Sequence, residues 1–286
     1  MTINIKTFFD SNTATFSHIV TDTSTQKCAI IDSVLDYDQY SGRTKTKSAD
    51  QVVDYINEEK LSVEWILETH IHADHITASH YLKEKLGGKI GIGAKIKDVL
   101  ALWVPIFNTN KDTTLDGSQF DKLFEDEEVF KLGNVDVKAI HTPGHTPACS
   151  SYLIEDALFA GDTIFMPDIG TARTDFPGGS AAALYDSVKK ILSLPYETRI
   201  FMCHDYPPEG RNVGWISTVK EQKEKNVLIR DGISKEDYVA VRNKRDEGKE
   251  VPKLLLPSIQ VNLRAGTFGA PEENNVRYIK IPVDKI

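Results

Sequence analysis

The stretch that decides the fold is Glu68-Thr69-His70-Ile71-His72-Ala73-Asp74-His75, in which four potential metal ligands fall within six residues of a chain that has eight histidines. Before it, the apolar run from Val63 to Leu67 predicts a short strand. After it, residues 76–86 carry apolar side chains at helical spacing and end at Gly87-Gly88. The ligands are therefore predicted to lie on a strand-to-helix turn, where the backbone can direct several side chains toward one point.

The ligand types in this stretch indicate a reactive metal site. Imidazole and carboxylate together suit zinc, iron or manganese. Structural zinc sites are closed and usually contain cysteine, and this stretch contains none. The alternative is a polar turn whose histidines have surface and helix-capping roles, and further ligand residues later in the chain argue against it.

Three later positions repeat the pattern of a strand followed by a ligand residue. His145 lies in a turn just past the predicted strand 135–140, Asp162 follows the apolar run 158–160, and His204 follows the run 200–203. Each of them taken singly has an ordinary explanation as a turn residue, a cap or a buried histidine. Because α/β folds usually place their sites where strands end at one sheet edge, the four segments together predict one metal centre.

Composition and charge exclude several classes of protein. The 286 residues are 40% hydrophobic and 27% charged, an ordinary globular mixture. The net charge of −8 argues against a nucleic-acid or anionic-membrane partner. Three scattered cysteines without a C-x-x-C pair fit a reducing compartment. We recognise no targeting peptide and no apolar run of membrane-spanning length, and so expect a soluble, cytoplasmic protein.

The order of the predicted elements indicates two similar layers. In each half of the chain strands come first and helices follow, and one helix is predicted from Ser48 with Gln51 as its capping-box partner. The polar stretch 104–128 is predicted to be a long loop at the mouth of the site, either a lid or an oligomer contact. Residues 215–286 are expected to form a C-terminal extension of a single domain that spans 1–286.

Taken together, these residues resemble the metallo-β-lactamase superfamily. The resemblance rests on the stretch from Thr69 to His75, followed in order by Gly144-His145, Gly161-Asp162 and His204, and it extends over nearly the whole chain. It implies an α/β fold, an αββα sandwich with the metal site at one edge of its two sheets. The name of the superfamily describes the fold and not an activity on β-lactams.

Several strings are similar to one branch of this superfamily, the persulfide (sulfur) dioxygenases. They are His72 to Thr77, His141 to Thr146, Arg173 to Phe176, His204 to Tyr206 and Asn262 to Gly266. The run Pro167 to Arg173 resembles a bacterial group named β-lactamase-like hydrolases and linked to sulfide detoxification. This resemblance implies a non-haem Fe(II) enzyme that oxidises glutathione persulfide, or a related low-molecular-weight persulfide, with O2 to sulfite and thiol.

The resemblance leaves two metal centres open. Hydrolases of the superfamily hold two zinc ions, and the matching positions here are His70, His72, His145 and Asp162 for one ion and Asp74, His75, Asp162 and His204 for the other. Persulfide dioxygenases hold one ferrous ion, with matching ligands His70, His145 and Asp162. The residues that would then orient these ligands are His72, Asp74, His75 and His204. The sequence contains every residue that either centre requires.

The resemblance also suggests residues that contact the substrate. Because glutathione carries two carboxylates, the candidates to bind it are Arg173, Arg211 and Arg264. Candidates for catalytic roles beside the iron are Asp74, His204 and Tyr206, the last as a hydrogen-bond donor near the sulfur. The expected partners are the persulfide and O2, with no nucleic acid or membrane, and a homodimer is an open alternative.

Two other functions fit the same residues. A two-zinc thioester hydrolase of the glyoxalase II type would use water activated by the metal to attack an acyl carbon. A non-enzymatic metal or sulfide sensor would bind its ligand without turnover. Oxygen uptake with glutathione persulfide distinguishes the dioxygenase from the hydrolase, which would cleave lactoylglutathione without oxygen.

Overall fold

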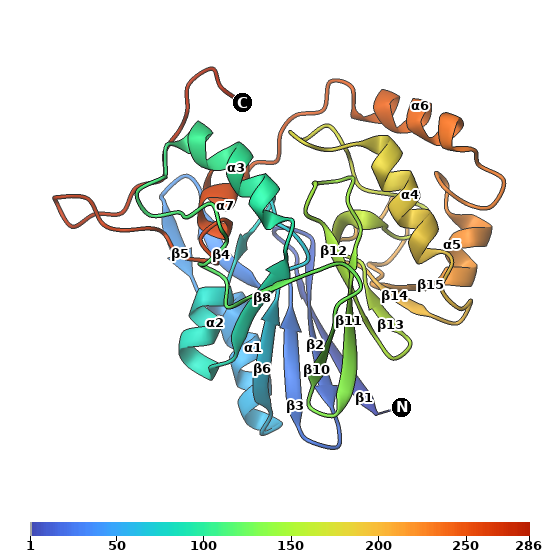
Figure 1. Cartoon of the computed structure of the whole chain (residues 1–286), viewed down its shortest axis with the longest axis horizontal. Coiled ribbons are helices and arrows are strands. Elements are labelled where there is room, and N and C mark those ends of the chain that lie inside the picture. Colours follow the sequence, from blue (N-terminus) through green and yellow to red (C-terminus); the bar gives the residue numbers. More distant parts are fainter. Residues whose placement is uncertain (1) are drawn as a thin grey trace.

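The computed structural model describes residues 2–286 and shows two six-stranded sheets packed between outer helices (Figure 1). The first sheet has the order β1-β2-β3-β6-β8-β9, with the bounds Ile3–Asp10, Thr15–Asp22, Lys27–Ile31, Ser62–Leu67, Lys89–Gly93 and Lys122–Phe124. The second has the order β10-β11-β12-β13-β14-β15, with the bounds Val129–Leu132, Val135–His141, Ser150–Ile154, Ala157–Phe159, Arg199–Phe201 and Ile216–Thr218. A small third sheet has the order β5-β4-β7, with the bounds Arg43–Lys45, Val34–Asp38 and Ile76–Thr77.

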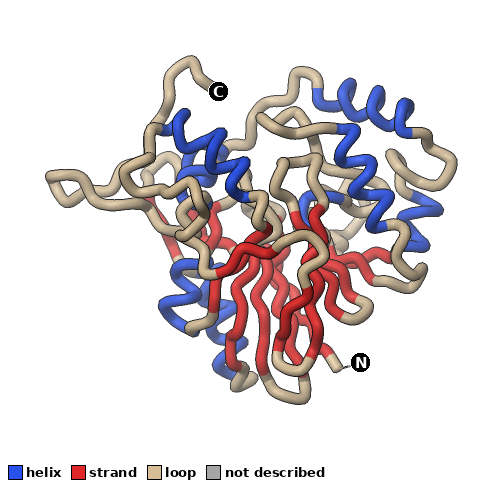
Figure 2. Tube along the Cα trace, in the orientation of Figure 1, coloured by secondary structure: helices blue, strands red, loops and turns tan. Residues whose placement is uncertain are grey.

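The helices form the two outer layers, as Figure 2 shows in blue. Those packed against the first sheet are α1 (Lys47–Glu58), α2 (Ser79–Leu86), α3 (Ile96–Phe107) and α7 (Leu255–Asn262). Those packed against the second sheet are α4 (Ala181–Ile191), α5 (Val219–Lys225) and α6 (Lys235–Asp246). The expected αββα sandwich is therefore confirmed.

Strand β3 shows how one apolar run serves both faces of a sheet. Successive side chains of a strand point to opposite faces. Cys28 and Ile30 pack with the helices outside the first sheet, whereas Ala29 and Ile31 pack with Tyr152 and other residues of the second sheet. The continuous apolar sequence of the central strands thus reflects burial on both sides.

The loop predicted at 104–128 is shorter than expected. Residues 104–107 complete α3 despite Pro105, and 122–124 form β9, which pairs in parallel with β8 at the sheet edge. Proline normally disfavours a helix interior, which is why a loop that contains Pro105 was predicted from residue 104. Only 108–121 connect the two elements.

The start of α1 also differs from the prediction. The helix begins at Lys47, and its N-cap residue Thr46 makes no side-chain capping bond. Instead the carboxylate of Asp36 in β4 accepts hydrogen bonds from the backbone N and Oγ of Ser48, both at 2.8 Å. The capping box of Ser48 with Gln51 was therefore wrong, because a residue twelve positions earlier provides the cap.

The C-terminal extension is part of the sandwich. Strand β15 completes the second sheet beside β14, and the buried helix α7, which the sequence did not indicate, packs on the first sheet. Among the described residues, none of the helices combines the length and apolar character that a bilayer crossing requires.

We predict that Phe159→Ala destabilises the fold by about 3–5 kcal/mol, because it opens a cavity between the two sheets. The free energy of unfolding is measured by urea denaturation. Val129→Ala is the control: this strand residue of the same sheet is 55% exposed, and its truncation should change the free energy by less than about 0.5 kcal/mol. Equal effects of the two substitutions would contradict the proposed core.

Candidate metal centre

The predicted ligand residues come from four segments that end at one edge of the sandwich. The histidine stretch follows β6, and His145 lies in the turn between β11 and β12. Asp162 is in a short 3-10 helix, Gly161–Thr163, directly after β13, and His204 follows β14. All of these side chains are buried except that of Asp74, which is partly exposed. The sequence therefore placed the ligands correctly at strand ends.

Asp162 lies between two sets of ligands. Its Oδ2 is 3.9 Å from Nε2 of His70 and 3.7 Å from Nε2 of His145. Its Oδ1 is 3.4 Å from Nε2 of His204, which in turn lies 3.2 Å from Oδ2 of Asp74. One carboxylate thus faces both halves of the centre.

Among the described residues, possible ligand atoms no more than 4.8 Å apart form four overlapping groups, and two of these groups together contain the seven predicted ligands. The first group is His70, His145 and Asp162, and the second is His72, Asp74, His75 and His204. All seven residues expected from the sequence are therefore brought together, but His72 falls in the second group and not, as expected for a two-metal centre, with His70, His145 and Asp162. Both groups match ligand sets that hold divalent metal ions.

Hydrogen bonds on the outer side of the histidine rings orient them. Nδ1 of His145 donates to the backbone carbonyl of Arg173 at 2.8 Å, and Nδ1 of His204 donates to that of Ala14 at 3.3 Å. With Nδ1 protonated, the lone pair of Nε2 points toward Asp162 and is available to a metal. Burial, together with the nearby His72 and His145, lowers the pKa of His70 and keeps its ring neutral.

Asp32, which the sequence analysis missed, holds the histidine stretch in place. Its Oδ1 accepts from the backbone N of Thr69 at 2.8 Å and lies 3.0 Å from Nε2 of His72. The carboxylate of Glu68 lies 3.2 Å from the same nitrogen. Although burial acts in the opposite direction, these two acids raise the pKa of His72. Asp32 directly follows β3, so the signal that identified the other ligands, an aspartate after a strand, could have identified it too.

Four buried ligand atoms have no hydrogen bond. They are Nδ1 of His72, Nε2 of His75, Nε2 of His204 and Oδ1 of Asp162. Buried polar atoms in proteins are nearly always paired, so these atoms indicate a partner that is not a protein group. Divalent metal ions fit them, since imidazole nitrogens and a carboxylate oxygen are the atoms present.

Asn262, the last residue of α7, forms hydrogen bonds with the backbone of the histidine stretch. Its Nδ2 donates to the backbone carbonyls of His72 and His75, and its Oδ1 accepts from the backbone N of Thr77, each at 2.9 Å. The side chain is 2% exposed. The geometry of the stretch therefore depends on a residue almost two hundred positions away.

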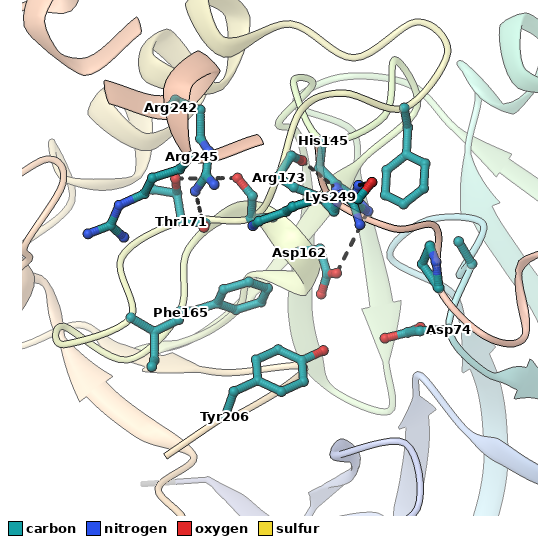
Figure 3. Close-up of a pocket in the computed structure, with 15 residues that line it drawn as sticks. Asp74, His145, Asp162, Phe165, Thr171, Arg173, Tyr206, Arg242, Arg245 and Lys249 are labelled. Carbon is teal, nitrogen blue, oxygen red and sulfur yellow. Dashed lines mark hydrogen bonds and ion pairs between the residues drawn. The ribbon is translucent and has the colours of Figure 1, made fainter. Parts of the chain in front are cut away.

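A cavity of about 400 Å³ opens onto this centre (Figure 3). Asp74, His145 and Asp162 line it on the side of the metal ligands. Apolar lining comes from Phe165, Ile169, Ala172 and Phe176, and basic lining from Arg173, Arg242, Arg245 and Lys249. The cavity thus joins an apolar wall to a cationic one beside the ligand groups.

Tyr206 lines the same cavity with a side chain that is 48% exposed. Its hydroxyl is turned toward Asp74 and Asp162 (Figure 3). Desolvation of this group, and then the charges of the two carboxylates, raise its pKa. The hydroxyl is protonated at neutral pH, as a phenol is without any shift, and it can donate a hydrogen bond into the cavity.

The three arginines suggested as substrate contacts lie in different surroundings. Arg173 lines the cavity, with its guanidinium bound to both oxygens of Asp175 at 2.6 Å. Arg211 does not line it and is bound to Asp205 and Asp168. The exposed cations at the cavity are instead Arg245 and Lys249, which the sequence analysis did not single out.

Arg264 bonds with the segment that was predicted to be a lid or an oligomer contact. The arginine is 6% exposed, and its Nε donates to Oγ1 of Thr113 at 2.9 Å and lies 3.2 Å from Asp112. These bonds fasten the segment to the end of α7. Within the described chain, no residue of 104–128 lines the cavity beside the ligands.

Comparisons with known proteins agree with this architecture. A family model described as the metallo-beta-lactamase superfamily matches residues 13–204. The chain is 48% identical to a "Probable metallo-hydrolase" of Burkholderia pseudomallei, over 99% of this chain and 100% of that protein. It is 50% identical to "Glyoxylase B2" of Dictyostelium discoideum, over 98% of this chain and 97% of that protein.

More distant similarity extends to persulfide dioxygenases. The bovine mitochondrial "Persulfide dioxygenase ETHE1" is 28% identical over 93% of this chain and 90% of that protein. The crystal structure of ETHE1 from Myxococcus xanthus has a TM-score of 0.74 at 26% identity, and the match covers 92% of this chain and 100% of that one.

We predict that Asp32→Asn weakens metal binding by about 10- to 100-fold, because it removes the carboxylate that orients His72. Metal affinity is measured by competition with a chelator, and circular dichroism verifies the fold. Asp22→Asn is the matched control, since Asp22 is an equally buried carboxylate that bonds with Ser24 and Thr25 at a turn. Unchanged metal affinity in Asp32→Asn would show that Asp32 does not act on the centre.

Proposed function

Because the chain belongs to the metallo-β-lactamase superfamily, we propose that this metal-dependent enzyme is a two-metal hydrolase that cleaves thioesters of a small anionic thiol, a reaction of the glyoxalase II type. The position of Asp162 is the observation that carries the proposal. Its two oxygens face different ligand groups, so this one side chain could help to hold a metal ion in each group. The names of the relatives at 48% and 50% identity support hydrolysis over the dioxygenase reaction.

The unpaired atoms of the second ligand group also support two ions. If only the group around His70 and His145 held a metal, Nε2 of His75 and Nε2 of His204 would remain buried without a hydrogen bond. Each such atom costs about 1–3 kcal/mol of desolvation. A second ion removes this cost for both nitrogens.

The bound metal ions would supply a water of lowered pKa and polarise the substrate carbonyl. The residues of the chain have three tasks in this reaction. The hydrogen bonds from His145 and His204 to backbone carbonyls fix the ring orientation of the ligands. Protonated Tyr206 donates a hydrogen bond to the substrate beside the carboxylates. The apolar wall around Phe165 and Phe176 excludes bulk water from the reacting group.

The thiol part of the substrate is expected to lie along the basic wall of the cavity. Arg242 is buried and bound to Asp246, and it anchors α6 to the backbone carbonyl of Thr171. Arg245, one turn further along α6, is exposed and has no ion-pair partner among residues 2–286, and Lys249 follows it. These two cations are placed to bind the carboxylates of a thiol such as glutathione.

A second candidate function is an iron-dependent persulfide dioxygenase. It is favoured by the compact group of His70, His145 and Asp162, a face of two histidines and one carboxylate, and by the similarity to ETHE1 over 93% of the chain. In that reaction a persulfide, O2 and water would give the thiol and sulfite. His72 would then serve to position the group rather than to bind the metal.

We predict that His204→Ala distinguishes the two functions. In a two-metal hydrolase it lowers the metal content from two ions to one per chain and abolishes cleavage of S-lactoylglutathione. In a one-iron dioxygenase the iron content stays the same. Metal content is measured by elemental analysis of protein purified without oxygen, and turnover by thiol release and by O2 uptake with glutathione persulfide.

The matched control is His80→Ala, which removes a half-exposed histidine of α2 outside the ligand groups and should change neither quantity. Asp162→Ala should abolish turnover with either substrate. One iron per chain in the wild type, with O2 uptake and no thioester cleavage, would overturn the hydrolase.

We predict that Arg245→Ala raises KM for S-lactoylglutathione about fivefold with little change in kcat, because an exposed ion pair contributes up to about 1 kcal/mol. Steady-state kinetics measure both constants. The control is Arg230→Ala, an exposed arginine that does not line the cavity and whose loss should leave KM unchanged. The same KM in both variants would remove Arg245 from the binding site.

A further inference from the structure

Thr15, the first residue of β2, contacts two of the metal-ligand histidines with a single hydroxyl group. Its Oγ1 lies 3.4 Å from Nδ1 of His75 and 3.3 Å from Nδ1 of His204. His75 belongs to the stretch after β6 in the first sheet, and His204 follows β14 in the second. One buried hydroxyl therefore lies against ligands that come from both sheets.

Main-chain bonds between the two sheets fix the position of this hydroxyl. Thr15 and His204 form an isolated antiparallel β-bridge. Beside this bridge, the backbone N of Phe16 donates to the backbone carbonyl of Cys203 at 2.7 Å. Since these contacts involve only the main chain, a substitution of the Thr15 side chain does not remove them.

The proton of the Thr15 hydroxyl points away from the histidines. Oδ2 of Asp10 accepts from Oγ1 of Thr13 at 2.7 Å, which uses the only proton of that hydroxyl. Oγ1 of Thr13 lies 2.8 Å from Oγ1 of Thr15 and so accepts its proton; the other acceptor nearby is the carbonyl of Thr13, at 3.4 Å. With its proton used in this way, the Thr15 hydroxyl can only accept from His75 and His204.

The second neighbour of each ring nitrogen indicates the same tautomer. Nδ1 of His75 is 3.1 Å from Oδ1 of Asp74, and Nδ1 of His204 is 3.3 Å from the carbonyl of Ala14. Carboxylate and carbonyl oxygens accept and do not donate. Each Nδ1 therefore carries the ring proton, and in the neutral ring Nε2 has a free lone pair. The two Nε2 atoms are among the buried atoms that have no hydrogen bond.

We propose that Thr15 is a positioning residue of the metal centre, whose hydroxyl holds His75 and His204 in the tautomer that presents Nε2 to a metal ion. Nε2 of His204 lies 3.2 Å from Oδ2 of Asp74 and 3.4 Å from Oδ1 of Asp162. With no proton on this nitrogen, a metal ion is the partner that the three atoms can share. The tautomer follows from the hydrogen bonds alone, whereas its effect on a second ion rests on the proposed function.

The test uses the variant Thr15→Val in the zinc-loaded full chain. Valine has nearly the shape of threonine but cannot accept a hydrogen bond, so the second ion should bind about tenfold more weakly. The affinity of the first ion, held by His70, His145 and Asp162, should stay the same. Competition with a chelator measures both affinities. Thr15→Ser keeps the hydroxyl and should bind both ions like the wild type.

A second measurement follows the ring protons and does not depend on turnover. NMR that correlates ring nitrogens with ring protons identifies which nitrogen of each histidine is protonated, in the zinc-loaded chain and after chelation. Circular dichroism verifies the fold. In the chelated wild type, His75 and His204 should both carry the proton on Nδ1. In chelated Thr15→Val, a share of both rings should carry it on Nε2, since one acceptor of Nδ1 is gone.

The control is Thr21→Val, which replaces a buried threonine near the other end of β2 and should change neither the affinities nor the tautomers. A proton on Nε2 in the wild type, or tautomers of Thr15→Val equal to those of the wild type, would overturn the role of Thr15. If the wild type binds one zinc ion only, the two-metal hydrolase is overturned, and the tautomers alone decide on Thr15.

Discussion

The structure depends on one constraint: several imidazoles and carboxylates must be buried next to one another, with hydrogen-bond partners on the outer side of the group and unpaired atoms on its inner side. Asp162 lies between the two ligand groups, and the rings around it are held from behind by Asp32, by Asn262 acting on the backbone, and by the carbonyls of Arg173 and Ala14. Burying such groups unpaired is costly. The two sheets converge where these partners can all be supplied.

Several residues around the metal centre lie in the C-terminal part of the chain, beyond the residues that the family model matches. That model ends at residue 204, whereas Tyr206, the basic face of α6 and Asn262 all follow it. The ligand groups thus belong to the shared part of the fold. The apolar part of the cavity lining, such as Phe165 and Phe176, also lies within the matched part, whereas Asn262, which bonds with the histidine stretch, and the basic side chains of α6 lie beyond it.

Ion pairs and hydrogen bonds in the second half of the chain connect the residues that line the cavity. Arg242 and Asp246 form a paired, buried unit, and Asp246 also accepts from the backbone N of Thr174 at 2.8 Å. Arg173 packs over Phe176 at 5.0 Å from the ring centre and binds the backbone carbonyl of Glu250. The loop beside the centre and the segment after α6 are therefore joined by charge-assisted hydrogen bonds.

The ligands were predictable because each follows an apolar run, and a local pattern is visible in a sequence. Asp32 has the same signal and was overlooked, whereas the cap of α1 by Asp36 and the burial of α7 have no local signal. Arg211 and Arg245 look alike in the sequence. Only the fold pairs the first with Asp205 and leaves the second exposed at the cavity.

The sequence by itself therefore determined which histidines and aspartates follow apolar strands, because this pattern is a property of short segments, and the family resemblance carried by those segments gave the αββα architecture. The tertiary structure alone decided which cations line the cavity at the centre and which distant residues hold the histidine stretch. These features depend on contacts between segments far apart in the chain, and such contacts form only when the sheets pack.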